Sequence, residues 1–193
     1  MARMSSREKL LEATWSSIAE HGIRGLRLED VAQRAEVAVS LIYYHFGNRI
    51  DLLTATMEYA NSRSPVSAMA ATPNKMSSYM RLEEGLMGDL DRSKSARSNA
   101  IVWSEFTAWA VFEPDIRSQM TIATQSLVVD LKKLIEDGQK DGSVRTDVDA
   151  ETEAELLVAV LDGLCTRWIS HSLPRVRARE LLGHTIRERL APL

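Results

Sequence analysis

The sequence predicts an all-α protein of about nine helices, and three observations support this prediction. Apolar residues recur three and four positions apart through most of the 193-residue chain, which is the spacing of amphipathic helices. No stretch alternates apolar and polar residues with the β-branched enrichment typical of half-buried strands. The nine glycines and five prolines lie mostly between the periodic segments. With 45% hydrophobic and 26% charged residues, the composition is that of a globular protein.

Four helices are expected in the N-terminal part. Residues Ser6–His21 carry apolar side chains every three or four positions, Ser5 or Ser6 can cap the start, and Gly22 follows the end. Two short helices come next, and a longer one begins after the Gly47-Asn48 break. These three helices are expected at Leu28–Arg34, Val39–His45 and about Arg49–Asn61.

Five more helices are expected after a loop. The loop is Ser62–Asn74, which is rich in Ser, Ala and Pro. Turns are indicated at Asp137-Gly138, at Asp141-Gly142 and at Pro174. The helices are expected at about residues 75–91, 96–112, 114–139, 150–171 and 174–190.

Charge and cysteine content limit the function classes. The formal net charge of −3 excludes a polycation that binds DNA by charge alone, but the first fifty residues hold seven Lys and Arg against six Asp and Glu. The single cysteine, Cys165, excludes an intramolecular disulfide and suits a reducing cytosol. The longest apolar run, Leu156–Leu161, has six residues, whereas a membrane span needs about 20. No signal-peptide core follows the first Met. We therefore expect a cytoplasmic protein without a membrane partner.

The segment Gly22–Leu53 predicts a helix-turn-helix, because two short helices are joined by a three-residue turn behind a longer helix. The second short helix must expose one face to enter the major groove of DNA. Val39, Ser40 and Tyr44 are expected on that face, while Ile42 and other apolar side chains hold the two helices together. A three-helix bundle that does not bind DNA has the same spacing, so the spacing alone leaves both alternatives open.

The residues that end this second helix are more specific. They read Ile-Tyr-Tyr-His-Phe from Ile42 to Phe46, and Asn48-Arg49 follows. Together with Asp30-Val31-Ala32 and with Gly22, they resemble the signature of the tetracycline-repressor (TetR) family. The resemblance covers about residues 5–53 in detail, and it implies an N-terminal DNA-binding domain followed by a helical ligand-binding and dimerisation domain.

The resemblance also implies roles for single residues. Tyr43, His45 and Arg49 would contact DNA phosphates, for which their N–H and O–H donors are suited. A surface histidine without function is the alternative for His45, and core packing is the alternative for Tyr44. The residues expected to bind DNA are Arg27, Val39, Ser40, Tyr43, Tyr44, His45 and Arg49.

Several positions depart from the family pattern. Leu26-Arg27 and Ala38 stand where the family commonly has hydroxyl residues that cap the two short helices, and Glu36 replaces the turn glycine. Ser40-Leu41 replaces Gly-Thr or Gly-Ser. The fold prediction is unaffected, but the operator sequence is not defined. A helical protein–protein adaptor whose helix-turn-helix no longer binds DNA therefore stays an alternative.

The last two expected helices predict a homodimer. Their apolar face is wider than a monomer needs, so a two-fold four-helix interface is the most economical use for it, with an ordinary buried hairpin as the alternative. Leu161-Asp162-Gly163-Leu164 followed by Trp168 is similar to the BetI-like branch of the TetR family. The apolar residues of the first of these helices are Leu156, Leu157, Val160, Leu161, Leu164, Cys165, Trp168 and Ile169.

Methionine and aromatic residues gather in the middle helices. Such side chains adapt to irregular apolar ligands, although a plain core uses the same residues. We expect a small, mainly apolar effector bound by Tyr79, Met80, Met87, Trp103, Phe106, Trp109, Met120 and Trp168. Nothing in the sequence selects among the possible polar anchors Ser104, Glu105, Thr107, Gln125 and Arg167.

Catalytic and metal sites are not expected. The four histidines lack ligand spacing with carboxylates, and Cys165 has no cysteine partner. No glycine-rich phosphate loop and no nucleophile elbow occurs. The sequence therefore predicts a protein that is not an enzyme and needs no cofactor.

The combined prediction is a homodimeric, sequence-specific transcriptional regulator. Residues 1–48 would form the DNA-binding domain, and residues 49–193 would bind the effector and form the dimer. We expect a repressor that the effector releases from double-stranded operator DNA. An activator on the same fold is an alternative.

Overall fold

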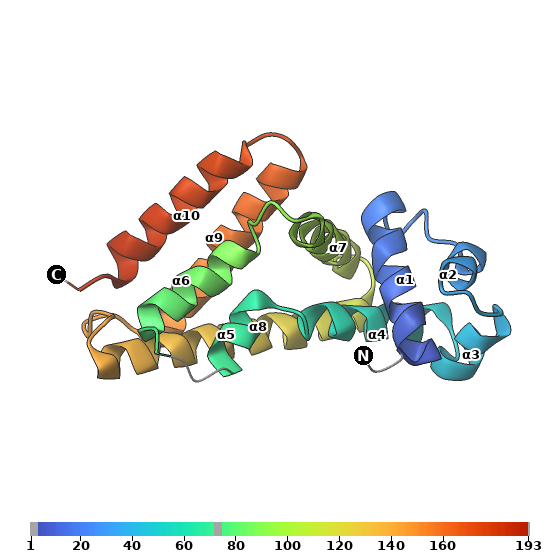
Figure 1. Cartoon of the computed structure of the whole chain (residues 1–193), viewed down its shortest axis with the longest axis horizontal. Helices are drawn as coiled ribbons and strands as arrows, with labels where there is room; N and C mark the ends of the chain where they lie inside the picture. The colour runs from blue at the N-terminus through green and yellow to red at the C-terminus, as the bar shows by residue number, and fades with distance from the viewer. Residues whose placement is uncertain (1–3, 72–74, 193) are drawn as a thin grey trace. The chain divides into compact units, whose positions relative to one another are not determined.

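The computed structural model describes residues 4–71 and 75–192. In these two stretches the chain forms ten helices and no strand (Figure 1). The prediction of an all-α protein is therefore confirmed. No helix in the described stretches is long and apolar enough to cross a lipid bilayer. The helices are α1 (Ser6–His21), α2 (Leu28–Arg34), α3 (Ser40–Phe46), α4 (Arg49–Asn61), α5 (Pro65–Ala71), α6 (Ser78–Gly88), α7 (Lys94–Ala110), α8 (Pro114–Asp141), α9 (Ala150–Ile169) and α10 (Arg175–Leu190).

In the described stretches, helix α5 is the one helix beyond the nine expected. It lies inside the segment that the sequence predicted to be a loop, so that prediction was wrong. Pro65 occupies the first helical position, where its missing N–H costs nothing, and alanines follow. Val66 and Ala70 are buried against α6. A Cβ atom on Gly85 of α6 would lie 2.9 Å from the Cα atom of Val66, so this close packing requires a glycine. The packing partner lies outside the segment, and local composition could not reveal it.

The predicted turn at Asp137-Gly138 was also wrong, because α8 continues through it to Asp141. A Cβ atom on Gly138 would lie 2.4 Å from a methyl carbon of Val144. This glycine therefore makes room for a neighbouring side chain instead of ending the helix. The helix ends at the second expected turn, where Gly142 has a φ of 76°.

The ends of several other helices differ from the predicted ones by one to three residues. Helix α6 starts at Ser78 because the hydroxyl of Ser77 accepts a hydrogen bond from the N–H of Met80. Helix α9 stops at Ile169, shortly before His171 adopts a φ of 60°. Helix α3 runs one residue later than predicted at both ends, from Ser40 to Phe46.

The chain divides into two compact units. The first contains residues 1–62 and 101–121, and the second contains residues 63–100 and 122–193. The first unit thus extends beyond residue 48, because α4 and residues 101–121 pack around the same core as the first three helices. A DNA-binding domain of residues 1–48 stays a functional prediction. The fully buried side chains of this first core include Leu10, Ile18, Val31, Ile42, Leu52, Leu53, Val102, Phe106 and Ile116.

The second unit is built around α6, α9 and α10, with α5 and parts of α7 and α8. An ion pair joins α9 to α10: Arg189 Nε donates to Glu153 Oε2 at 2.9 Å, and Glu153 is only 3% exposed. The pair ties two helices whose facing sides are otherwise apolar. The fully buried side chains of this second core include Leu82, Leu86, Leu90, Leu131, Leu134, Ile135, Leu157, Leu182, Ile186 and Leu190.

The helix-turn-helix forms without side-chain caps, as its unusual residues predicted. Arg27 precedes α2 and Val39 precedes α3, and neither helix start receives a side-chain hydrogen bond. By contrast, Ser5 and Glu8 form a capping box at the start of α1, and Asn48 caps α4. The geometry of α2 and α3 therefore depends on the turn between them and on the core below.

That turn has a Schellman geometry with a residue poorly suited to it. The N–H of Glu36 donates to the Gln33 carbonyl at 3.1 Å, and the N–H of Val37 donates to the Ala32 carbonyl at 3.0 Å. Glu36 consequently has a φ of 57°, in the left-handed region that favours glycine. The turn is kept although the residue at its centre carries a side chain.

We expect Glu36→Gly to raise the free energy of unfolding by about 1 kcal/mol, because glycine adopts this φ without the steric cost of a Cβ atom. Urea unfolding followed by circular dichroism measures the change. Glu36→Ala is the control: it keeps the Cβ atom and should gain little. Equal stabilities of the Gly and Ala variants would show that backbone strain at residue 36 is absent.

Candidate functional site

Helix α3 exposes two large aromatic side chains. Tyr43 is 53% exposed and Tyr44 is 80% exposed, while Ile42 and Phe46 of the same helix are buried in the first core. The side chain of Tyr44 therefore does not pack in the core, which removes that alternative. Ser40 is exposed as well. The helix is thus anchored by two residues and presents hydroxyl groups to solvent on its other sides.

His45 and Val39 are half-buried at the two ends of α3. The His45 ring meets the Tyr44 ring edge-on, with 5.1 Å between the ring centroids. The guanidinium of Arg7, from α1, lies 5.4 Å from the centroid of the Phe46 ring. The C-terminal end of α3 therefore brings together an imidazole, a guanidinium and exposed phenol groups.

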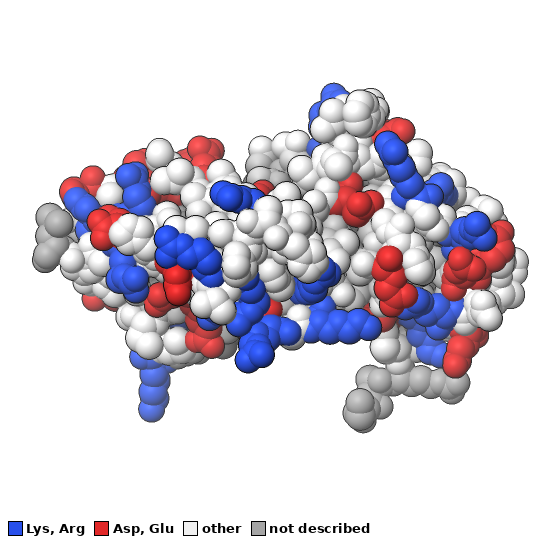
Figure 2. Space-filling view, turned by 90° about the horizontal axis from the view of Figure 1, so that it is seen from above, with Lys and Arg blue, Asp and Glu red and all other residues white. Residues whose placement is uncertain are grey.

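Arg49 begins α4 directly after this cluster, and it is exposed. Its Nη2 atom donates a hydrogen bond to the carbonyl of Ile23 at 2.7 Å. A guanidinium has five N–H donors, so the remaining ones are available to a phosphate. Arg27 is also exposed, at the start of α2. On the face drawn in Figure 2, acidic and basic side chains are interspersed.

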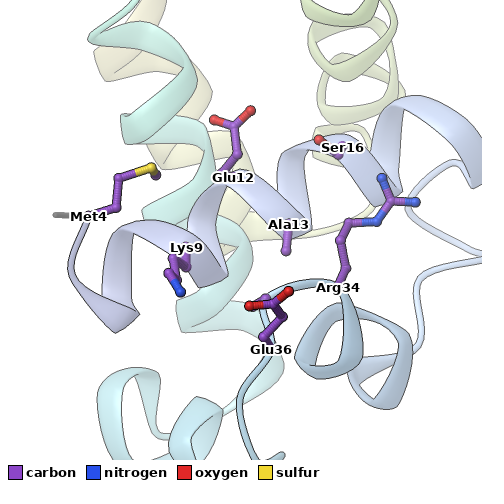
Figure 3. A pocket seen from close by; sticks show the side chains of 8 residues that line it. Met4, Lys9, Glu12, Ala13, Ser16, Arg34 and Glu36 are labelled. Atoms are coloured by element: carbon purple, nitrogen blue, oxygen red, sulfur yellow. The ribbon is translucent and has the colours of Figure 1, made fainter. Parts of the chain in front are cut away.

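A groove of about 330 Å³ lies in the first unit between α1 and the end of α2, as Figure 3 shows. Its two cations, Lys9 and Arg34, are balanced by Glu12 and Glu36. Arg34 is in addition paired with Glu20, whose Oε1 atom lies 3.0 Å from Arg34 Nη1. The groove therefore selects neither anions nor cations, and it contains none of the residues predicted to bind DNA or an effector.

The eight residues predicted to line an effector pocket divide equally between the two units. In the first unit, Phe106 is fully buried in the core, and Trp103, Trp109 and Met120 pack against the same core. These four side chains supply core volume to the first unit. The carboxylate of Glu105, one of the possible polar anchors, accepts a hydrogen bond from the N–H of Ile23 at 2.8 Å.

In the second unit, Tyr79, Met87 and Trp168 pack against the second core, and Met80 is 51% exposed. Met80 and Met87 line a groove of about 700 Å³ between α6 and α10. This groove also contains arginine and glutamate side chains, two of which have a structural role. Arg175 and Arg179 donate to the Leu90 and Met87 carbonyls at 3.0 and 2.7 Å.

A group of polar residues in the second unit was missed by the sequence reasoning. Burial raises the pKa of Asp89 to about 7, a hydrogen bond with Asn99 acts in the opposite direction, and the nearby Asp162 carboxylate raises it further. Burial also raises the pKa of the Cys165 thiol, and both carboxylates add to that effect. The available signal was weak: Asp89 directly follows the end of α6, with Leu86 three positions before it and Leu90 next to it. Among the residues that the structure describes, no three His, Cys, Asp or Glu side chains are arranged to hold a metal ion.

Two family matches account for most of the chain. Residues 10–56 match the family of bacterial regulatory proteins, tetR family, and residues 80–191 match the C-terminal domain of BetI-type transcriptional repressors. The chain belongs to the TetR family of transcriptional regulators. The predicted family and its BetI-like branch are therefore confirmed. So is the prediction that the protein is not an enzyme, because members of both matched families are transcriptional regulators.

Relatives of full length support this membership. The HTH-type transcriptional regulator BetI of Escherichia coli (strain K12) is 26% identical over 192 residues, covering 95% of this chain and 93% of that protein. BetI of Burkholderia mallei is 28% identical over 195 residues, covering 96% and 94%. The exposed face of α3 is therefore to be interpreted as part of a DNA-binding regulator.

Solved structures agree with the fold. A Rhodococcus sp. protein described as a TetR-family transcriptional regulator is 31% identical, has a TM-score of 0.87, and is matched over 97% of this chain and 100% of its own. A transcriptional regulator from Saccharomonospora viridis, crystallised with choline, is 24% identical with a TM-score of 0.80, over 97% and 98% of the two chains. The second likeness shows the fold alone.

Proposed function

We propose that this TetR-family regulator is a cytoplasmic homodimer that represses transcription from an operator and leaves the DNA when a small effector binds. The observation that carries the DNA-binding part is the exposure of Tyr43 and Tyr44 on a helix anchored by Ile42 and Phe46. A soluble protein without a partner for that face gains nothing from two exposed aromatic rings there. The two protomers would each place α3 in the major groove, and two operator half-sites require these helices to lie roughly 34 Å apart or a multiple of it. Effector binding would change this separation.

The proposed DNA contacts divide into two groups. The first group would donate hydrogen bonds to phosphate oxygens, and these contacts do not depend on the DNA sequence. It consists of Tyr43, His45, Arg49 and Arg27. Val39, Ser40 and Tyr44 would face the bases at the N-terminal part and exposed side of α3. Since the first fifty residues have a net charge of only +1, from seven basic and six acidic residues, the affinity must come from few phosphate contacts doubled by the second protomer.

We expect Tyr43→Phe to weaken binding about five- to tenfold on operator and unrelated duplexes alike, because one phosphate hydrogen bond is lost. The dependence on salt should stay unchanged, since no charge is removed. Ser40→Ala should instead change the ratio between operator and unrelated DNA. Fluorescence anisotropy at several salt concentrations, with duplexes selected from a random pool, measures both. An operator-specific loss in the Tyr43 variant would place this side chain at a base.

The proposed dimer contact is the part of α9 that its own chain leaves open. Leu157, Leu161 and Leu164, predicted for this face, are buried in the second core instead. What remains is a narrower stripe of apolar and small residues, with Leu156 37% exposed. A Cβ atom on Gly163 would have no atom within 4 Å. A second copy of α9 could therefore approach closely, and the stripe consists of Leu156, Ala159, Val160 and Gly163.

We expect Gly163→Arg to give a folded monomer, because the single chain has room for the side chain whereas a closely packed partner helix does not. Operator affinity should fall by a factor of about 100 or more, since two linked half-site contacts become one. Sedimentation and anisotropy test the two effects. Val129→Arg, at a 62% exposed position of α8, is the matched control and should change neither. A dimeric Gly163→Arg variant with full affinity would move the interface elsewhere.

The effector is proposed to be a small molecule with a mainly apolar surface. Met80 and Met87 of the groove between α6 and α10 support it, as do Tyr79 and Trp168, which pack against the second core. The choline in the Saccharomonospora viridis protein fits the same description, because methyl groups cover its ammonium. Asp89 adds a buried carboxyl group of the kind that favours such a cation, and it ionises near pH 7.

Binding of choline can be compared with binding of its neutral isostere, in which a carbon atom replaces the ammonium nitrogen. If Asp89 faces the ligand, choline affinity should rise as the pH increases through about 7, because the carboxylate form then predominates, while the isostere should show no such rise. Asp89→Asn should remove the rise. Asp141→Asn is the control, since hydrogen bonds from Ser143 and Ser78 outweigh burial and lower the pKa of Asp141 to about 2. Tryptophan fluorescence reports binding, and no response to either compound would count against the proposed chemical class.

A further inference from the structure

The backbone of Ile23 is held by two charged side chains. Its N–H donates to Oε2 of Glu105 on α7 at 2.8 Å, and its carbonyl accepts from Nη2 of Arg49 on α4 at 2.7 Å. Ile23 itself is only 4% exposed, so its backbone is anchored by the first core. The loop between α1 and α2 thus links the start of α4 to the middle of α7.

Gly22 has the backbone conformation that this arrangement requires. It has a φ of 70°, which ends α1 and turns the N–H of Ile23 towards α7. A Cβ atom at this position would lie 2.8 Å from Oε2 of Glu105. A side chain at residue 22 would therefore both strain the backbone and displace the carboxylate.

Glu105 is held in place by its own helix. Val102 and Phe106, three residues before it and one after it, are fully buried in the first core. These two anchors fix the rotation of α7, so the carboxylate has little freedom to leave the N–H of Ile23. Two hydrogen bonds, one between Glu105 and Ile23 and one between Ile23 and Arg49, therefore connect a rigid helix to a side chain at the surface.

We propose that Glu105 is a positioning residue for DNA binding that acts on Arg49 by holding the backbone of Ile23 in place. The inference rests on the proposed contact of Arg49 with a phosphate. The N–H and the carbonyl of Ile23 belong to two successive peptide groups, so Glu105 acts by position: its carboxylate fixes residue 23, and with it the carbonyl that accepts the hydrogen bond from Arg49. The guanidinium is then ordered before DNA arrives, and less conformational freedom is lost on binding.

Glu105→Ala should weaken binding to a duplex selected from a random pool by about five- to tenfold, the cost of ordering one long side chain. The salt dependence should be unchanged, because Glu105 does not touch DNA. By contrast, Arg49→Ala should lower the affinity, and it should reduce the slope of log affinity against log salt concentration by about one. In the Arg49→Ala background, Glu105→Ala should have no further effect.

Two conservative variants separate position from charge. Glu105→Gln keeps an oxygen at the same reach and should restore most of the affinity, although it is neutral. Glu105→Asp keeps the charge but is one methylene shorter, and it should lose as much affinity as the alanine variant. Both should keep the helicity of the parent chain, so they carry the test if Glu105→Ala unfolds.

The outcomes are distinct. Equal losses from Glu105→Ala with and without Arg49, or wild-type affinity in the Asp variant, would overturn the positioning role while leaving DNA binding intact. A parent chain that binds no duplex from the random pool would overturn the proposed function itself.

Discussion

The helix-turn-helix of this chain depends on apolar surface that it does not itself supply. Three helices of 16, 7 and 7 residues cannot bury a sufficient core alone. Helix α4 and residues 101–121 complete it, and Val102, Phe106 and Ile116 are fully buried in the same core. The geometry of the DNA-binding face is therefore set by residues far away in the sequence. This dependence explains why uncapped α2 and α3 are nevertheless well packed.

The same dependence decides what could be read from the sequence. Helix positions, the helix-turn-helix and the exposed side of α3 follow from local spacing and from the motif around Tyr43. Helix α5 and the continuous α8 do not, because Val66 and Gly138 meet partners that only tertiary packing defines. Phe106, predicted to line a ligand pocket, is fully buried in the first core, and an aromatic stripe has the same spacing in a core and in a cavity wall.

Polar residues were harder to predict than apolar ones. Glu105 is one of five possible ligand anchors by sequence, yet its carboxylate accepts a backbone N–H from a residue 82 positions earlier. Asp89 follows no motif at all, and its pKa is raised by burial and by the charge of Asp162, which lies 73 positions later in the sequence. The role of a single acidic residue depends on which unpaired donor or neighbouring charge the fold places beside it.

The half-buried thiol of Cys165 has a practical consequence for labelling experiments on this protein. Because burial raises its pKa, the group stays protonated at neutral pH and reacts slowly with thiol reagents, for which the thiolate is the nucleophile. The chain has no other cysteine. A cysteine introduced at Tyr44, where the side chain is 80% exposed, would therefore be the one that takes a spectroscopic label. Paired labels in a dimer would then report the separation of the two α3 helices directly, with the natural thiol left in place.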